Sequence, residues 1–256
     1  MIKVVIKKTA LYLSLFLLSL VLFLLVSLPA EFVWQKGIAP QLKGQNIPIK
    51  VLSLNGTLWE GQALVRYQHI ESVVDWKISV FGLVSLKLPV DLNIKSQAGT
   101  IKMAANVGLG ASDIDVISAD IDLAYLTPFF KRQRVTLGGQ VIAKSVQVVV
   151  VDNHVKSASG LVSWSGGDIA YPAGRQLHER TLPVFKGRLE TKSDGNIVLG
   201  VRDAGASFDL IEGLLDTEGS AMLTVKRRLL DLADEEWPQN SNEKDTVFKV
   251  KKNIYN

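Results

Sequence analysis

Hydrophobic and polar positions alternate along most of the chain after residue 50, with the two-residue period of a strand that buries one face. The clearest run covers residues 86–95, where every second residue from Leu86 to Ile94 is apolar and the residues between them are mostly polar. Similar runs cover 59–67, 74–80, 101–109, 119–125, 135–151, 158–164, 184–192, 196–202 and 220–226. Because no helical pattern alternates with these runs, they predict an antiparallel, all-β architecture.

The turns between these runs are marked by residue pairs that suit tight turns, namely Asn55-Gly56, Gly138-Gly139, Asp152-Asn153, Gly166-Gly167, Asp194-Gly195 and Glu218-Gly219. Pro89 lies on the polar side of its run, which predicts an edge strand or a bulge. The alternation allows two arrangements. The strands can form a sandwich that buries its own apolar face, or an open curved sheet whose apolar groove could hold a lipid or accept a partner's strand.

Helical patterns are few. Residues 31–43 predict a short helix or an extended neck, residues 126–134 a short helical turn, and residues 227–237 a helix. The last residues are polar, although the segment VFKV predicts a final strand.

An uncharged segment, residues 10–28, is the strongest single feature of the sequence. As a helix it would be roughly 28 Å long, which matches the hydrocarbon core of a bilayer. A cleaved signal peptide is the competing interpretation, but its apolar run is usually only about 7–15 residues. Leu28 also stands where a cleavage site needs a small residue. We therefore expect an uncleaved membrane anchor that includes Leu11, Leu17, Leu22 and Leu28.

The formal net charge of +4 comes mostly from the N-terminal flank. Lys3, Lys7 and Lys8 precede the uncharged segment, and the first acidic residue is Glu31. The nearly neutral remainder argues against a nucleic-acid partner. Lysines before an anchor hold that end in the cytoplasm. The sequence thus predicts a single-pass membrane protein with a cytoplasmic N-terminus (1–9), a transmembrane helix (10–28), a neck (29–50), an all-β domain (51–237) and a polar C-terminal tail with a possible last strand (238–256). In a Gram-negative cell this places the anchor in the inner membrane and the all-β domain in the periplasm.

Catalytic and metal-binding patterns are weak. The chain has no cysteine and three histidines, His69, His154 and His178, which excludes disulfides and thiolate sites and disfavours a histidine-rich metal site. Asp113 and Asp115 form one close acidic pair, and 120 and 122 form another, but the glycine and closing glutamate of a calcium loop are missing. We expect no enzymatic activity, catalytic residue, metal or cofactor.

The most distinctive local motif is Gly-Thr-Leu-Trp-Glu-Gly, residues 56–61. Its glycines suit a tight turn and a close backbone approach, and its tryptophan suits either a core position or a partner contact. The residues singled out are Gly56, Thr57, Leu58, Trp59 and Gly61. A weaker echo contains Trp164, Gly166 and Gly167, which predicts either two similar halves or a chance similarity.

The order of these motifs resembles the type II secretion system protein N (general secretion pathway protein N) family. The resemblance rests on the anchor ending at 28–30, the 56–61 motif, and the segments 161–167, 182–183, 194–195 and 225–232. It implies an accessory inner-membrane component that supports assembly of the apparatus or export of folded proteins, has other inner-membrane components as partners, and has no catalytic residues to carry over. The 56–61 motif is also similar to AsmA-like envelope proteins, which implies the alternative of a lipid-handling groove.

Overall fold

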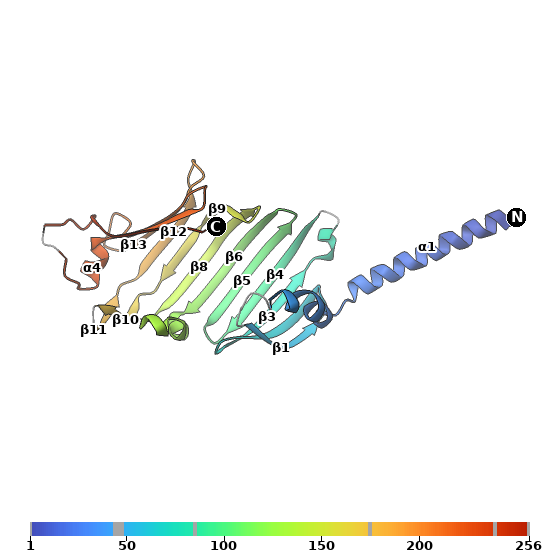
Figure 1. The fold of residues 1–256 in the computed structure, drawn as a ribbon, viewed down its shortest axis with the longest axis horizontal. Coiled ribbons are helices and arrows are strands. Elements are labelled where there is room, and N and C mark those ends of the chain that lie inside the picture. The colour runs from blue at the N-terminus through green and yellow to red at the C-terminus, as the bar shows by residue number, and fades with distance from the viewer. Residues whose placement is uncertain (1, 43–48, 84–85, 174–175, 238–239, 255–256) are drawn as a thin grey trace.

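The computed structural model describes residues 2–42, 49–83, 86–173, 176–237 and 240–254. They form one 13-stranded sheet in which all neighbouring strands are antiparallel (Figure 1). The predicted all-β antiparallel architecture is therefore confirmed. In sheet order the strands are β1 (Ile49–Gly56), β2 (Glu60–Tyr67), β3 (Ile70–Ile78), β4 (Lys87–Ser96), β5 (Gly99–Gly108), β6 (Ala111–Asp122), β8 (Gln140–Val151), β9 (His154–Trp164), β12 (Phe185–Thr191), β13 (Ile197–Asp203), β14 (Ile211–Leu215), β15 (Ser220–Lys226) and β16 (Thr246–Asn253).

A small second sheet, a long N-terminal helix and several short helices complete the fold. The second sheet contains β7 (Thr136–Leu137), β10 (Gly167–Ala173) and β11 (Gln176–Leu182). The helices are α1 (Ile2–Val26), α2 (Ala30–Val33), the π-helix η1 (Trp34–Ile38), α3 (Ala39–Leu42), the 3-10 helices η2 (Val80–Leu83) and η3 (Leu123–Gln133), and α4 (Arg227–Leu232). The predicted strand 119–125 is thus too long, because η3 begins at residue 123. The helix predicted over 227–237 ends at residue 232.

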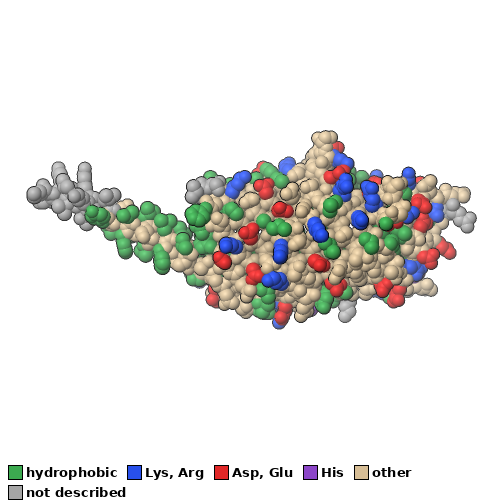
Figure 2. Space-filling model, turned by 180° about the vertical axis from the view of Figure 1, so that it is seen from behind, with side chains coloured by type: hydrophobic (Ala, Val, Ile, Leu, Met, Phe, Trp, Pro, Cys, Tyr) green, Lys and Arg blue, Asp and Glu red, His purple; other side chains and the backbone are tan. Residues whose placement is uncertain are grey.

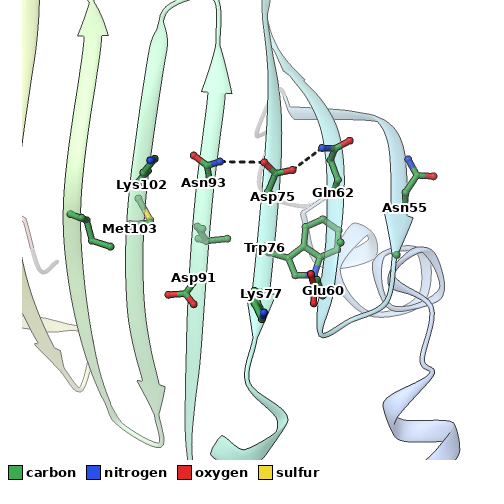
Figure 3. A pocket seen from close by; sticks show the side chains of 14 residues that line it. Asn55, Glu60, Gln62, Asp75, Trp76, Lys77, Asp91, Asn93, Lys102 and Met103 are labelled. Atoms are coloured by element: carbon green, nitrogen blue, oxygen red, sulfur yellow. Dashed lines mark hydrogen bonds between the residues drawn. The ribbon is translucent and has the colours of Figure 1, made fainter.

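The two faces of the large sheet differ in chemistry because the register keeps the two-residue period aligned from strand to strand. On one face Ala63 lies opposite Val74, and Val74 lies opposite Ile94. On the other face Gln62 lies opposite Asp75, which lies opposite Asn93 (Figure 3). Figure 2 shows the molecule from behind, where Lys, Arg, Asp and Glu side chains are scattered over the sheet. We call these the apolar face and the polar face.

The apolar face is not covered by a second large sheet. Among the described residues, Leu210 is the one large side chain that is fully buried, at 0% exposure. On the apolar face itself, Val107 and Leu223 keep about two fifths of their surface exposed. Of the two arrangements that the alternation allows, the chain therefore adopts the open sheet and not the sandwich.

One end of the sheet is closed by a compact core. Leu182, Phe185, Leu210 and Ala233 are buried together, and Trp164 packs against them. These residues come from the small sheet, from β12, from the connection between β13 and β14, and from the segment after α4. The small sheet and α4 thus cover the apolar face at this end.

Pro89 corrects one expectation, because β4 is an interior strand that pairs with both β3 and β5. The carbonyl of Pro89 accepts from the backbone N–H of Ser79, which lies beyond the last residue of β3. In an antiparallel strand the N–H and C=O of one residue point to the same side. The missing N–H of Pro89 therefore faces the end of β3 and interrupts no ladder, so neither an edge position nor a bulge is needed.

Two carboxylates fasten the closed end. Asp203 is 6% exposed, and its oxygens accept from Nε and Nη2 of Arg228 at 2.9 and 2.8 Å. The hydrogen bond from Arg228 lowers the pKa of the Asp203 carboxyl. Bonds from His178 and Tyr171, each 2.6 Å long, likewise lower the pKa of Glu235. Burial, followed by the bond to Glu235, raises the pKa of Tyr171 to about 12.

We expect the closed end to lose stability in acid. A carboxylate with a lowered pKa stabilises the fold above its usual pKa of about 4, and that contribution is lost as the pH falls through the lowered value. The urea concentration at the unfolding midpoint of the full chain should thus decrease as the pH is lowered from 5. The double variant Asp203→Asn/Glu235→Gln should be less stable at neutral pH and show a shallower fall. Asp113→Asn, on the exposed polar face, should behave like wild type; an equally steep fall in the double variant would contradict the prediction.

Candidate functional site: the joint between the N-terminal helix and the sheet

The N-terminal helix projects from the β1 end of the sheet (Figure 1). The side chains of Leu17 and Leu22 are exposed, and Leu28, beyond the helix, is half-buried. The side chains of the other residues predicted to anchor or orient the chain lie outside the described part of the structure, namely those of Leu11, Lys3, Lys7 and Lys8. Within the part of the chain that is described, none of the helices combines the length and hydropathy needed to cross a membrane.

The Gly56–Gly61 motif holds the end of this helix. The indole Nε1 of Trp59 donates to the carbonyl of Leu25 at 2.7 Å, and the backbone N–H of Leu58 donates to the carbonyl of Leu28 at 2.9 Å. Pro29 and Thr57 form an isolated antiparallel bridge. The last four carbonyls of a helix have no partner within it, so the Trp59 bond satisfies one of them. We call this set of contacts the joint.

The motif forms a tight turn between β1 and β2. Gly56 has φ of 98°, a conformation that favours glycine. The hydroxyl of Thr57 accepts from the backbone N–H groups of Trp59 and Glu60 at 3.3 and 3.2 Å, which fixes the turn. These bonds aim the Trp59 indole at the helix. Each residue singled out at the start of the motif therefore has a local role in presenting the tryptophan.

Trp76 on β3 supports the turn from the neighbouring strand, a role that the sequence did not reveal. Its Nε1 donates to the carbonyl of Leu58 at 3.1 Å, and its ring passes over Gly61, its register partner. A Cβ on Gly61 would lie 2.4 Å from Cζ2 of Trp76 and 2.4 Å from the carbonyl oxygen of Asn55. Gly61 is thus required by the close approach of both groups.

Beside the joint, part of the neck packs over the apolar face of the sheet. Residues 30–38 and strands β1 to β4 enclose a hollow of about 470 Å³. Val33, Trp34 and Ile38 line it from the neck, and Val65 and Val74 line it from the sheet. Because its wall is almost wholly apolar, the neck and the sheet are held together mainly by hydrophobic contact.

On the polar face, a second and more open hollow of about 780 Å³ lies over β1 to β6 (Figure 3). Oδ1 of Asp75 accepts from Nε2 of Gln62 at 2.7 Å, and its Oδ2 accepts from Nδ2 of Asn93 at 3.3 Å. Lys95 lies 3.8 Å from the same carboxylate. The carboxylate is thus occupied by its neighbours in the sheet, as expected for a solvated sheet face.

The three histidines lie in separate places. The ring of His69 lies 5.3 Å from that of Phe129 and is tilted against it by 40°. His154 Nδ1 lies 2.7 Å from the carbonyl oxygen of Asp152, and His178 belongs to the closed end. Among the described residues no group of three or more metal-ligating side chains is close enough to hold an ion. The geometry therefore offers a mechanical joint and exposed surfaces as the features with functional potential.

The second motif occupies a different kind of position. Trp164 is the last residue of β9, and its Nε1 donates to the carbonyl of Gly138 at 2.9 Å. Its ring lies 5.4 Å from that of Phe185 in the closed end. Gly166 lies in the connection to β10, which begins at Gly167. Trp59 and Trp164 thus have different surroundings, because the first contacts the N-terminal helix and the second packs in the closed end. The two similar halves stay a prediction.

The sequence matches the protein family described as type II secretion system (T2SS), protein N, over residues 48–236. The match begins just before β1 and ends after α4, so it contains the 56–61 motif and the closed end and leaves out α1 and β16. No curated protein and no solved structure matches the chain. Because the match covers most of the chain, this protein belongs to the type II secretion system protein N family.

Proposed function

We propose that this chain is an accessory inner-membrane component of the type II secretion system, which supports assembly of the apparatus or export of folded proteins across the outer membrane. The family match supports a role in type II secretion. The observation that carries the finer proposal is the joint. A helix clamped to the sheet by Trp59 and Leu58 transmits the orientation of the helix to the sheet.

The proposed topology places residues 1–9 in the cytoplasm, residues 10–28 in the inner membrane and the sheet in the periplasm. The uncharged sequence of residues 10–28 and the exposed apolar side chains of α1, such as Phe16 and Phe23, support it. A bilayer would cover these side chains, whereas water would leave them unpaired with any apolar surface. Phe32 and Trp34 follow the segment, where an aromatic belt is expected.

In this arrangement the sheet acts as a broad, non-enzymatic surface for other inner-membrane components. A long sheet has two edges whose backbone groups can pair with a partner's strand. Here the β1 edge lies beside the joint and therefore close to the membrane, whereas β16 is the opposite edge. The chain can thus connect a partner to the membrane at a fixed distance.

Deleting this chain should lower the export of a folded type II substrate and leave its synthesis unchanged. Export should return with the full-length chain and not with a version in which residues 1–28 are replaced by a cleavable signal peptide. The measurement is the ratio of secreted to cell-retained substrate. Normal export in the deletion strain would contradict the proposal, and full rescue by the unanchored version would contradict the role of the anchor alone.

A further inference from the structure

In the part of the chain that the structure describes, the last strand, β16, has a neighbouring strand on one side only. Within the described residues it pairs only with β15, in regular register from Phe248 to Asn253. The N–H of Ile254 donates to the carbonyl of Gly219 at 2.9 Å. Because antiparallel residues point alternately toward and away from a given neighbour, Val250 and Lys252 also face β15, while Lys249 and Lys251 point their N–H and C=O groups outward. On the other side of β15, the backbone N–H of Asp216 donates to the carbonyl of Ser220. The backbone groups of Ser220 therefore point away from β16, which agrees with the same alternation.

Both faces of β16 are exposed as well as its edge. On the apolar face Phe248 and Val250 are 53% and 45% exposed. On the polar face Lys249 and Lys251 are exposed. A long edge strand with exposed apolar side chains is a site at which another strand can add. An added strand would therefore gain both backbone hydrogen bonds and side-chain contacts here.

The charge of this edge selects the partner. Residues 246–254 contain three lysines, Lys249, Lys251 and Lys252, and no acidic residue. Pairing with β16 of a second copy would place lysine beside lysine, which is unfavourable. The other edge, β1, offers Lys50 and no acidic residue. Neither edge of the large sheet in a second copy supplies the opposite charge. The edge strand β11 of the small sheet has a single carboxylate, Glu179, directly followed by Arg180. A strand with several carboxylates therefore comes from another protein.

The edge is also held in place before any partner arrives. The backbone N–H of Arg227 donates to the carbonyl of Asp245 at 2.8 Å, and that of Arg228 donates to the carbonyl of Glu243 at 3.1 Å. Arg228 Nη1 additionally donates to Oε2 of Glu243 at 2.9 Å while the same guanidinium binds Asp203. The start of β16 is thereby fixed to α4 and the closed end. A preformed edge lowers the ordering cost of binding.

We propose that the outer edge of β16 binds an extended, acidic segment of a partner protein by strand addition. The backbone of the segment bonds to Lys249 and Lys251, its apolar side chains pack on Phe248 and Val250, and its carboxylates lie beside the lysines. The identification of the partner as a component of the secretion apparatus rests on the proposed function. The preference of the edge for an acidic strand is argued from the edge itself and is independent of that function.

The first test measures binding of a fluorescent peptide of alternating valine and glutamate to the full-length protein in detergent, by anisotropy. Lys251→Pro removes an outward N–H and leaves the bonds to β15 intact, because proline is tolerated where the N–H faces solvent. We expect the Lys251→Pro variant and the Lys249→Glu/Lys251→Glu variant to bind this peptide at least about tenfold more weakly than the wild type does. Two double variants serve as controls because they keep the backbone N–H of residue 251. They are Lys249→Arg/Lys251→Arg and Lys251→Ala/Lys252→Arg.

Unaltered urea midpoints establish that each variant is folded. If the midpoint of a variant falls, its binding result is set aside. The test is then made on the wild type alone, by comparing its affinity for the glutamate peptide with its affinity for a peptide of alternating valine and lysine. Wild type should bind the glutamate peptide at least about tenfold more tightly than the lysine peptide. Equal affinity for the two peptides, or wild-type affinity in a folded Lys251→Pro, would overturn the proposal.

The export assay separates this proposal from the proposed function. If deletion of the chain lowers export and Lys251→Pro exports normally at wild-type protein level, the edge is not the docking site, although the role in secretion stands. If deletion leaves export unchanged while the peptide results follow expectation, the edge binds acidic strands but the role in secretion is wrong. Lowered export in both strains supports both.

Discussion

Replacing Leu210 by alanine is expected to lower the free energy of unfolding by about 2–5 kcal/mol, a large fraction of the stability of a typical domain. Leu210 is fully buried and lies between β13 and β14 against Leu182, Phe185 and Ala233. The cavity left by its side chain would be surrounded by three different elements that cannot all collapse into it. Because most other apolar side chains of the sheet are half-exposed, the described part of the chain has no second buried core that could compensate for this loss.

The measurement is the denaturant midpoint of the full-length protein in detergent. Leu109→Ala is the matched control, since Leu109 is 88% exposed and its truncation removes the same atoms from solvent instead of from a core. The control should stay close to wild type. Equal midpoints for Leu210→Ala and Leu109→Ala would show that the closed end is not the stabilising core.

Replacing Gly61 by alanine is expected to cost about 1–3 kcal/mol and to loosen the joint. The new Cβ would overlap the carbonyl oxygen of Asn55 and the ring of Trp76, at 2.4 Å from each. The carbonyl belongs to the backbone of β1 and cannot rotate away. Trp76 would have to move, and with it the bond that its Nε1 makes to Leu58, the residue that holds the end of the N-terminal helix.

The chain has no cysteine, so spin labels can be introduced cleanly at positions 22 and 102, both exposed in the structure. Wild type should give a narrow distribution of distances between the two labels. Gly61→Ala and Trp59→Phe should broaden it, because the first displaces the turn and the second lacks the indole N–H. Gly37→Ala is the control, since nothing lies within 4 Å of a Cβ there. A distribution that stays narrow in Gly61→Ala would show that the joint does not set the direction of the helix.

The strands were predictable where one face is wet and the other apolar. The run 86–95 becomes β4, because its alternation continues in register across β3 and β5. The strands β10 and β11 were missed: their sequence contains Pro172 and a polar stretch from 178 to 180, so no clear alternation marks them. Whether the sheet is open or closed could not be predicted, since a sandwich and an open sheet require the same alternation.

The joint was only partly predictable. The composition of residues 56–61 singled out the motif, but the group that Trp59 binds is the backbone carbonyl of Leu25, and a carbonyl has no signature in sequence. Trp76 could have been found only by counting register through the Gln68-His69 turn to Gly61, and that turn lacks the usual Asn-Gly signal. Local turn chemistry was therefore readable, whereas its distant partners were not.

Site-specific photocrosslinking in living cells tests most directly whether this chain is a membrane-anchored component of the secretion apparatus. Probes in the full-length protein would occupy exposed positions on the polar face and on the outer edge of β16, and adducts would be identified by mass spectrometry. We predict adducts with inner-membrane components of the type II secretion system. Adducts only with lipids or lipid-transport proteins, from probes that react efficiently, would contradict the account.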